Sequence, residues 1–98
     1  MQILERTIER ATCRRAWLEF GVRSLKLNVT GQTGWPDRMF LIPHGRPLFV
    51  EFKRPGGVVS ARQRHILNIL RSLGYKVGVC DSTTQALRII KRYLSTGG

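Results

Sequence analysis

The stretch that decides the fold is residues 48–80, which read LFVEFKRPGGVVSARQRHILNILRSLGYKVGVC. Four of its first five residues are apolar, and residues 48–52 predict a strand. Residues 60–73 carry apolar side chains at helical spacing, and Gly74 follows where a helix end needs a left-handed residue. Residues 75–80 predict a second strand. A strand, a helix and a strand in this order form a right-handed crossover, which makes the two strands parallel.

Four further elements surround this crossover. Residues 4–20 have apolar side chains at helical spacing and predict a helix. Residues 26–29 alternate as in a strand, and a turn joins the apolar run 39–42 to the first strand of the crossover, which predicts a hairpin. A last helix follows Ser82. The predicted fold is one α/β domain over residues 1–98, with the order α-β-β-β-α-β-α and a mixed sheet flanked by helices.

The chain is short and strongly basic. It has 98 residues, with 17 Lys and Arg against 6 Asp and Glu, and a formal net charge of +11. This length fits one domain, and a hydrophobic content of 42% fits a folded chain. The charge exceeds the roughly 2–8 that solubility requires, so it favours a polyanionic partner, nucleic acid above all. An anionic membrane surface is the rival, but no predicted helix pairs a basic face with a broad apolar face.

Two other classes of protein are excluded by what the chain lacks. No apolar run approaches the roughly 20 residues of a membrane span, and the N-terminal residues show no signal-peptide pattern. Cys13 and Cys80 have no further ligand at metal spacing, so neither a disulfide framework nor a zinc site is expected, and both are predicted to be packing residues. We therefore expect no membrane partner and a cytoplasmic location.

The scarce acidic residues point to a site at one end of the sheet. Asp37 precedes the first strand of the predicted hairpin and Glu51 lies near the end of the second, so the two carboxylates are expected to meet. Lys53 shares a face with Glu51, while Phe52 points into the core. Two carboxylates with a carbonyl suit Mg²⁺, and a lysine beside that ion can position the attacking water. Taken alone, Asp37 would be a turn residue and Lys53 a surface partner of Glu51.

These residues resemble the PD-(D/E)xK nuclease superfamily and, more narrowly, the VRR-NUC family of virus-type replication-repair nucleases. The motifs that carry the resemblance are Gly34-Trp35-Pro36-Asp37-Arg38, Val50-Glu51-Phe52-Lys53, the Gly56-Gly57 turn, Gln63, and Leu73-Gly74-Tyr75-Lys76-Val77. The resemblance runs from about Glu5 to Leu87 and implies a restriction-endonuclease-like fold. It also implies metal-dependent hydrolysis of DNA, in a bacterial or phage-infected cell. Trp35 departs from the family, which often has a smaller residue at that position.

The family assigns roles to individual residues of this chain. Asp37 and Glu51 would ligate the metal, with the backbone carbonyl of Phe52 as a further ligand, and Lys53 would be the catalytic lysine. The expected cofactor is Mg²⁺, with Mn²⁺ as a substitute.

Two assignments stay open. A glutamate of the first helix completes such sites, as a catalytic residue and possible ligand; Glu9 is the first choice and Glu5 the second, and the alternative for Glu9 is an ordinary solvated position. Gln63 would reach toward the phosphate or a metal-bound water. It also stands three residues after Ser60, the spacing of a capping box, in which the glutamine bonds back to the helix start.

Basic residues and one tryptophan are the candidates for contact with DNA. They are Arg10, Arg14, Arg38, Arg54, Arg62 and Trp35. Arg10 and Arg14 continue a helical stripe from Arg6, which is equally compatible with a solvated face. Trp35 lies in a loop and is suited to stacking on bases, whereas Trp17 is expected in the core or an interface.

The expected function is a structure-selective DNA endonuclease. Small stand-alone relatives act on branched DNA, so the resemblance implies a Holliday-junction (four-way junction) resolvase. A homodimer would supply the two symmetric sites that paired cuts require. The alternatives are a flap, end-processing or single-strand nuclease of the same fold, and a nucleic-acid-binding module with no activity. The presence of every site residue argues against the inactive module.

Overall fold

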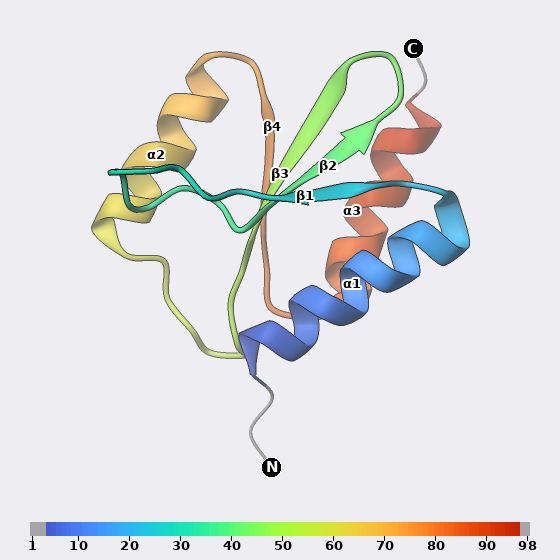
Figure 1. Cartoon of the computed structure of the whole chain (residues 1–98), viewed down its shortest axis with the longest axis horizontal. Coiled ribbons are helices and arrows are strands. Elements are labelled where there is room, and N and C mark those ends of the chain that lie inside the picture. The colour runs from blue at the N-terminus through green and yellow to red at the C-terminus, as the bar shows by residue number, and fades with distance from the viewer. Residues whose placement is uncertain (1–3, 97–98) are drawn as a thin grey trace.

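The computed structural model describes residues 4–96, which form a four-stranded sheet with helices on both faces (Figure 1). In chain order the elements are α1 (Glu5–Phe20), β1 (Ser24–Lys26), β2 (Arg38–Ile42), β3 (Arg46–Phe52), α2 (Ala61–Ser72), β4 (Lys76–Cys80) and α3 (Thr83–Ser95). This order confirms the predicted α/β fold. The first three and last two residues of the predicted domain lie outside the described part of the chain.

The sheet is mixed, and its strands lie in the order β1-β2-β3-β4. The β1–β2 and β2–β3 pairs are antiparallel, and β3 and β4 are parallel. The single parallel pair is the one joined through α2, as the crossover predicted. Because β2 and β3 form a hairpin, the start of β2 lies beside the end of β3, and this end of the sheet holds the predicted carboxylates.

Two apolar layers hold the helices to the sheet. On one face, alternate residues of β2 and β3, among them Phe40, Leu48 and Phe52, pack in the cluster that also contains residues of α1 and α3. On the other face, Phe49 packs against Ile66 of α2. Figure 1 shows α2 on one side of the sheet and α1 with α3 on the other. Since side chains of a strand alternate between faces, β3 contributes to both layers and is buried along most of its length.

The first strand differs from its prediction. It spans Ser24–Lys26 instead of residues 26–29, and it pairs with β2 through contacts such as Lys26 opposite Arg38. One hydrogen bond of the ladder continues past the strand, because the Leu27 N–H donates to Asp37 O at 3.0 Å. The regular pairing nevertheless ends at Lys26, although the alternating sequence continues.

The tryptophan and cysteine predictions have separate outcomes. Trp17 is 49% exposed and not part of the core, and the Arg23 guanidinium lies 4.7 Å from the centre of its ring.

Cys80 is buried in the larger apolar layer and Cys13 packs against the same layer, which confirms both as packing residues. Burial raises the pKa of the Cys80 thiol to about 11, so the thiol stays protonated at neutral pH. Within residues 4–96 every helix is too short or too polar to cross a membrane.

Candidate metal centre

The hairpin brings Asp37 and Glu51 together at one end of the sheet. Arg38 pairs with Val50, so extending the register by one residue sets Asp37 opposite Glu51. The Phe52 N–H donates to Asp37 Oδ2 at 2.8 Å, which fastens the entry of β2 to the end of β3. Partial burial raises the pKa of Asp37, and the charges of Glu9 and Glu5 add to the rise.

The segment before Asp37 is held in place by its own sequence. Gly34 has a φ of +88°, and a Cβ there would lie 2.7 Å from Arg62 Cγ. This position therefore needs glycine both for its backbone angle and for its close approach to α2. Pro36 is fully buried, and Trp35 is half-buried against the smaller apolar layer, with its indole N–H donating to Gln32 at 2.8 Å. Trp35 thus has a packing role, and stacking on DNA by Trp35 stays a prediction.

Glu51 is a buried carboxylate with one oxygen bonded and one oxygen without a partner. The residue is 3% exposed. Its Oε2 accepts from Gln63 Nε2 at 2.9 Å and lies 3.4 Å from Lys53 Nζ. The other oxygen, Oε1, is buried and has no hydrogen-bond partner in the described part of the chain. Burial, and then the neighbouring Asp37, raise the pKa of Glu51 to about 7. A buried, unpartnered carboxylate oxygen is costly, which marks Oε1 as a place where a ligand is expected.

Lys53 stands beside this carboxylate on a well-supported backbone. Its N–H donates to Cys80 O at 2.8 Å and so extends the hydrogen bonding with β4 beyond Phe52. Its side chain is only 13% exposed, and Nζ lies 4.0 Å from Glu5 Oε1 in addition to its contact with Glu51. The structure therefore brings Asp37, Glu51 and Lys53 together, as the sequence predicted.

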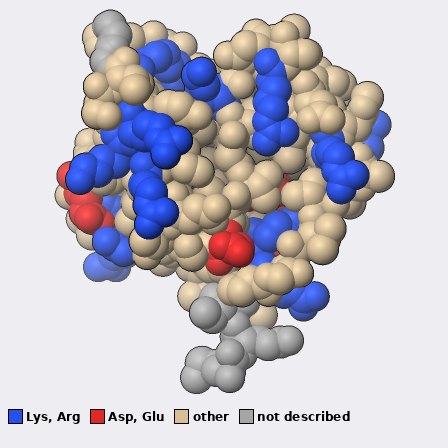
Figure 2. All heavy atoms as spheres, turned by 180° about the vertical axis from the view of Figure 1, so that it is seen from behind, with Lys and Arg blue, Asp and Glu red and all other residues tan. Residues whose placement is uncertain are grey.

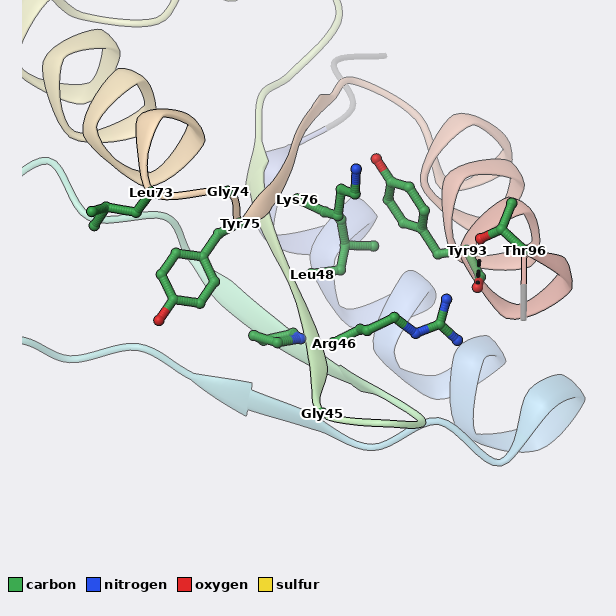
Figure 3. Close-up of a pocket in the computed structure, with 10 residues that line it drawn as sticks. Gly45, Arg46, Leu48, Leu73, Gly74, Tyr75, Lys76, Tyr93 and Thr96 are labelled. Carbon is green, nitrogen blue, oxygen red and sulfur yellow. Dashed lines mark hydrogen bonds between the residues drawn. The ribbon is translucent and has the colours of Figure 1, made fainter. Parts of the chain in front are cut away.

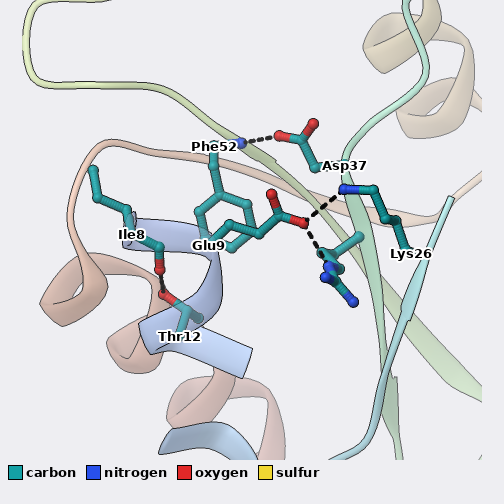
Figure 4. A network of polar contacts seen from close by, with 7 residues as sticks. Ile8, Glu9, Thr12, Lys26, Asp37 and Phe52 are labelled. Atoms are coloured by element: carbon teal, nitrogen blue, oxygen red, sulfur yellow. Dashed lines mark hydrogen bonds and ion pairs between the residues drawn. The ribbon is translucent and has the colours of Figure 1, made fainter. Parts of the chain in front are cut away.

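The two helix acids have different surroundings. Glu9 is 9% exposed and its Oε2 accepts from Arg38 Nε at 2.6 Å and from Lys26 Nζ at 3.4 Å (Figure 4). Glu5 is half-exposed and faces Lys53. Glu9 has the larger effect on the pKa of Asp37. Both acids therefore lie at the site, and the choice of Glu9 as a metal ligand stays a prediction.

Lys26 is a member of this network that the sequence did not single out. It lies 17 positions after Glu9 in the chain, on a strand of three residues whose pattern gave no sign of a site. Arg38 is 21% exposed and bonded to Glu9, so its first role is to tie α1 to β2. Contact of Arg38 with DNA stays a prediction.

Gln63 combines the two interpretations that the sequence left open. Its Oε1 accepts from the Ser60 N–H at 2.9 Å, and Ser60 Oγ accepts from the Gln63 N–H at 3.1 Å, which is a complete capping box. The same amide donates to Glu51 Oε2 through Nε2. Gln63 therefore caps α2 and contacts the site at the same time.

The remaining cations lie around the site and over the surface. Arg6 and Arg10 line a hollow of about 470 Å³ next to Asp37, together with the acids of α1 and their partners. Arg14, Arg54 and Arg62 are exposed. On the face seen from behind, Lys and Arg side chains are spread widely and acidic ones are few (Figure 2). A basic surface therefore surrounds a small acidic centre.

A second hollow, of about 500 Å³, lies away from these carboxylates. It is lined by residues at the starts of β3 and β4 and at the end of α3, among them Arg46, Tyr75, Lys76 and Tyr93 (Figure 3). The carboxylates sit at the other end of β3, so this hollow does not belong to the candidate metal centre.

The donor set fits a hard divalent cation. Asp37 and Glu51 supply carboxylate oxygens, and the unpartnered Glu51 Oε1 is an open donor. Across residues 4–96 there is no group of three His, Cys, Asp or Glu side chains placed to hold a metal by themselves. Backbone, water and substrate oxygens would have to complete the coordination, which is the usual situation for Mg²⁺. The Phe52 carbonyl stays a predicted ligand.

The chain is similar to known proteins in its sequence and in its fold. Residues 3–84 match the family model described as "VRR-NUC domain". The "Putative nuclease p44" of Acyrthosiphon pisum secondary endosymbiont phage 1 is 36% identical over 64 residues, which cover 65% of this chain and 69% of that protein. A solved structure described as "VRR_NUC domain" superposes with a TM-score of 0.79 at 27% identity and covers 91% of this chain and 96% of its own. Another, "VRR_NUC domain protein", shares the fold with a TM-score of 0.83 at 17% identity, over 99% of this chain and 93% of its own.

Proposed function

Since this chain belongs to the VRR-NUC domain family, we propose that it is a metal-dependent nuclease that hydrolyses phosphodiester bonds of DNA. The observation that carries the proposal is the group formed by Asp37, Glu51 and Lys53, in which Glu51 Oε1 is buried and open. The nuclease name of the phage relative supports the same activity.

The chemistry follows from the placement of these side chains. Asp37, Glu51 and the Phe52 carbonyl would hold Mg²⁺ or Mn²⁺, whose chemistry there is to stabilise negative charge that develops on the attacked phosphate. The Lys53 ammonium, held beside Glu51, orients a water in line with the leaving oxygen and donates to the developing charge. The water oxygen bonds to phosphorus, the bond to the leaving oxygen breaks, and the proton released by water ends on that oxygen.

Binding of the substrate would rest on charge and not on base sequence. Arg6 and Arg10 border the hollow beside Asp37, and neither forms an ion pair within residues 4–96. Further cations are exposed on the surface of the protein, namely Arg14, Arg54 and Arg62. Contacts of this kind bind phosphates, fix the position of the strand and carry no sequence information.

We propose a four-way junction as the preferred substrate and a homodimer as the acting species. Residues 4–96 carry one candidate centre, and paired symmetric cuts need two such centres. A flap, end-processing or single-strand nuclease of the same fold remains the alternative substrate class, and a binding module without activity is the alternative function.

Cleavage of a labelled panel tests these proposals together. The panel holds a four-way junction, a flap, a linear duplex and a single strand, with Mg²⁺, Mn²⁺ or EDTA. We expect wild type to cut only with metal, and Lys53→Ala and Asp37→Asn to bind DNA but cut ~10²–10⁴-fold more slowly, because they lack the water-orienting or metal-binding group. Lys91→Ala, an exposed cation of α3, is the matched control and keeps the wild-type rate.

The outcomes of the panel distinguish the resolvase, a nuclease for another DNA structure, and a binding module without activity. Paired, symmetric nicks in the junction support the homodimeric resolvase, and preferential cutting of another substrate names the alternative nuclease. If folded wild type binds every substrate and cuts none with either metal, the binding module replaces the nuclease.

A further inference from the structure

The start of α2 carries a contact that a helix cap by itself does not require. In the capping box, the Gln63 amide oxygen accepts from the Ser60 N–H at 2.9 Å. The amide nitrogen of the same side chain donates to Glu51 Oε2, also at 2.9 Å. One planar amide therefore connects the first turn of α2 to the buried carboxylate of β3.

The cap decides which end of the amide faces Glu51. A backbone N–H can only donate, so it selects the amide oxygen and turns the NH₂ group away from Ser60. A flipped amide would place its NH₂ against the Ser60 N–H and its oxygen against the Glu51 carboxylate, and both hydrogen bonds would be lost. The orientation that suits the cap is thus the orientation that donates to Glu51.

This arrangement treats the two oxygens of Glu51 differently. Gln63 Nε2 and, at 3.4 Å, Lys53 Nζ both approach Oε2. Within residues 4–96 no group donates a hydrogen bond to Oε1, although this atom is buried. Holding one oxygen by hydrogen bonds fixes the plane of the carboxylate and leaves the other oxygen open in a defined direction.

We propose that the Ser60–Gln63 capping box is a positioning device for the metal centre, which orients Glu51 so that Oε1 is held open to a divalent cation. Ser60 and Gln63 are positioning residues in this proposal, because they act through Glu51. It rests on the proposed function in that it requires a metal at Asp37 and Glu51.

The chain contains its own control for the cap. At the start of α3, Ser82 Oγ accepts from the Gln85 N–H at 3.1 Å, and the Gln85 amide oxygen accepts from the Asp81 N–H at 3.0 Å. The Gln85 side chain makes no hydrogen bond to Glu51 or to any other carboxylate within residues 4–96. Gln63 and Gln85 therefore share the capping role, and only Gln63 reaches the site.

The experiment compares Gln63→Met with Gln85→Met, using binding of Mn²⁺ to the full chain without DNA, followed by electron paramagnetic resonance. Methionine keeps the length of the side chain and removes the amide. Each variant therefore loses a side-chain oxygen that accepts from a backbone N–H at the start of a helix, the Ser60 N–H for Gln63 and the Asp81 N–H for Gln85. We expect Gln63→Met to bind Mn²⁺ ~10-fold or more weakly, and Gln85→Met to stay within about twofold of wild type. The thermal midpoints of the two variants should fall by similar amounts.

Variants of Ser60 form the second part of the Mn²⁺-binding experiment. Ser60→Ala removes the hydroxyl that fixes the first turn of α2, and we expect Mn²⁺ affinity to fall about threefold. Ser60→Asp restores a capping oxygen and should restore the affinity. Ser82→Ala, the matched change on α3, should leave the affinity unchanged.

The outcomes distinguish the positioning role of the capping box from the proposed nuclease activity on which it rests. If folded Gln63→Met binds Mn²⁺ like wild type, or if both methionine variants lose affinity equally, the positioning device is refuted while the nuclease stands. If wild type binds no Mn²⁺ and cuts no DNA, the metal centre itself is refuted.

Discussion

Glu51 is the residue at which stability and proposed function oppose each other. It is nearly inaccessible to water and lies beside a second carboxylate, so its ionised form is destabilised in the metal-free protein. A bound divalent cation would reverse this, because it favours the charged form of both carboxylates. A divalent cation at the proposed site would thus offset the cost of burying Glu51 beside the partly buried Asp37.

The pH dependence of stability follows from this residue. The pKa of Glu51 is about 7 in the folded chain against an ordinary value of 4.5, so the folded state binds more protons between these pH values. The free energy of unfolding of the metal-free protein should therefore fall as pH rises from about 4.5 to about 7. The fall should be on the order of 3 kcal/mol, because the pKa differs by about 2.5 units and one unit corresponds to about 1.4 kcal/mol.

Glu51→Gln tests the assignment of this effect. The variant should lose most of the pH dependence and be more stable than wild type at pH 8, while it loses metal binding and cleavage. Urea unfolding in EDTA at pH 5 and pH 8 measures the difference. Equal pH dependence in wild type and variant would assign the effect to other groups.

At the scale of elements, the site depends on how the turn before β2 meets α2. The backbone at Gly34 touches Arg62, and the Arg62 Nε donates to Thr33 O at 3.3 Å. Asp37 follows this turn directly, so the packing of the turn against α2 sets where the carboxylate lies. On the other side of the sheet, the Glu9–Arg38 contact ties α1 to the same strand.

Substitutions at two glycines separate the effect of the contact between Gly34 and Arg62 on stability from the effect of the backbone angle. Gly34→Ala and Gly31→Ala both place a methyl group at a positive φ, but only the methyl at position 34 meets other atoms, whereas position 31 has nothing within 4 Å. We expect Gly31→Ala to cost about 1 kcal/mol of unfolding free energy and Gly34→Ala at least about 1–2 kcal/mol more. Chemical denaturation measures both, and equal losses would show that the contact with Arg62 is unimportant.

At the scale of the whole molecule, charge is arranged as a small acidic centre within a basic surface. The net charge of +11 would attract the phosphate backbone of the proposed DNA substrate, and four of the six acids, Glu5, Glu9, Asp37 and Glu51, lie at the proposed metal centre. This separation allows a strongly cationic protein to hold carboxylates at the point of chemistry.

The salt dependence of DNA binding tests which cations take part. Removing two phosphate contacts should lower the magnitude of the slope of log K against log salt by about 2. We expect this for the double variant Arg6→Ala with Arg10→Ala, measured by fluorescence anisotropy of a labelled duplex in EDTA. Arg15→Ala lies on the same helix but removes a cation already paired with Glu19 at 2.7 Å, and it should leave the slope unchanged. If all the variants keep the wild-type slope, the DNA does not bind at Arg6 and Arg10 but at another part of the surface.

The sequence by itself determined the order of elements, the hairpin and the meeting of Asp37, Glu51 and Lys53. These depend on periods of two to four residues and on the register of one short hairpin, and both are local properties of the chain. The family resemblance rests on the same local motifs.

Only the tertiary structure decided the surroundings of these residues. The bond from Arg38 to Glu9 joins positions 29 apart, and the bond from Gln63 to Glu51 joins positions 12 apart across different elements. No periodic pattern encodes such pairs, because they depend on how α1 and α2 pack on the sheet. Packing therefore placed Glu9 in an ion pair and set Trp35 against the smaller apolar layer. It also gave Gln63 two roles, as the cap of α2 and as a contact of Glu51, which the sequence had left as alternatives.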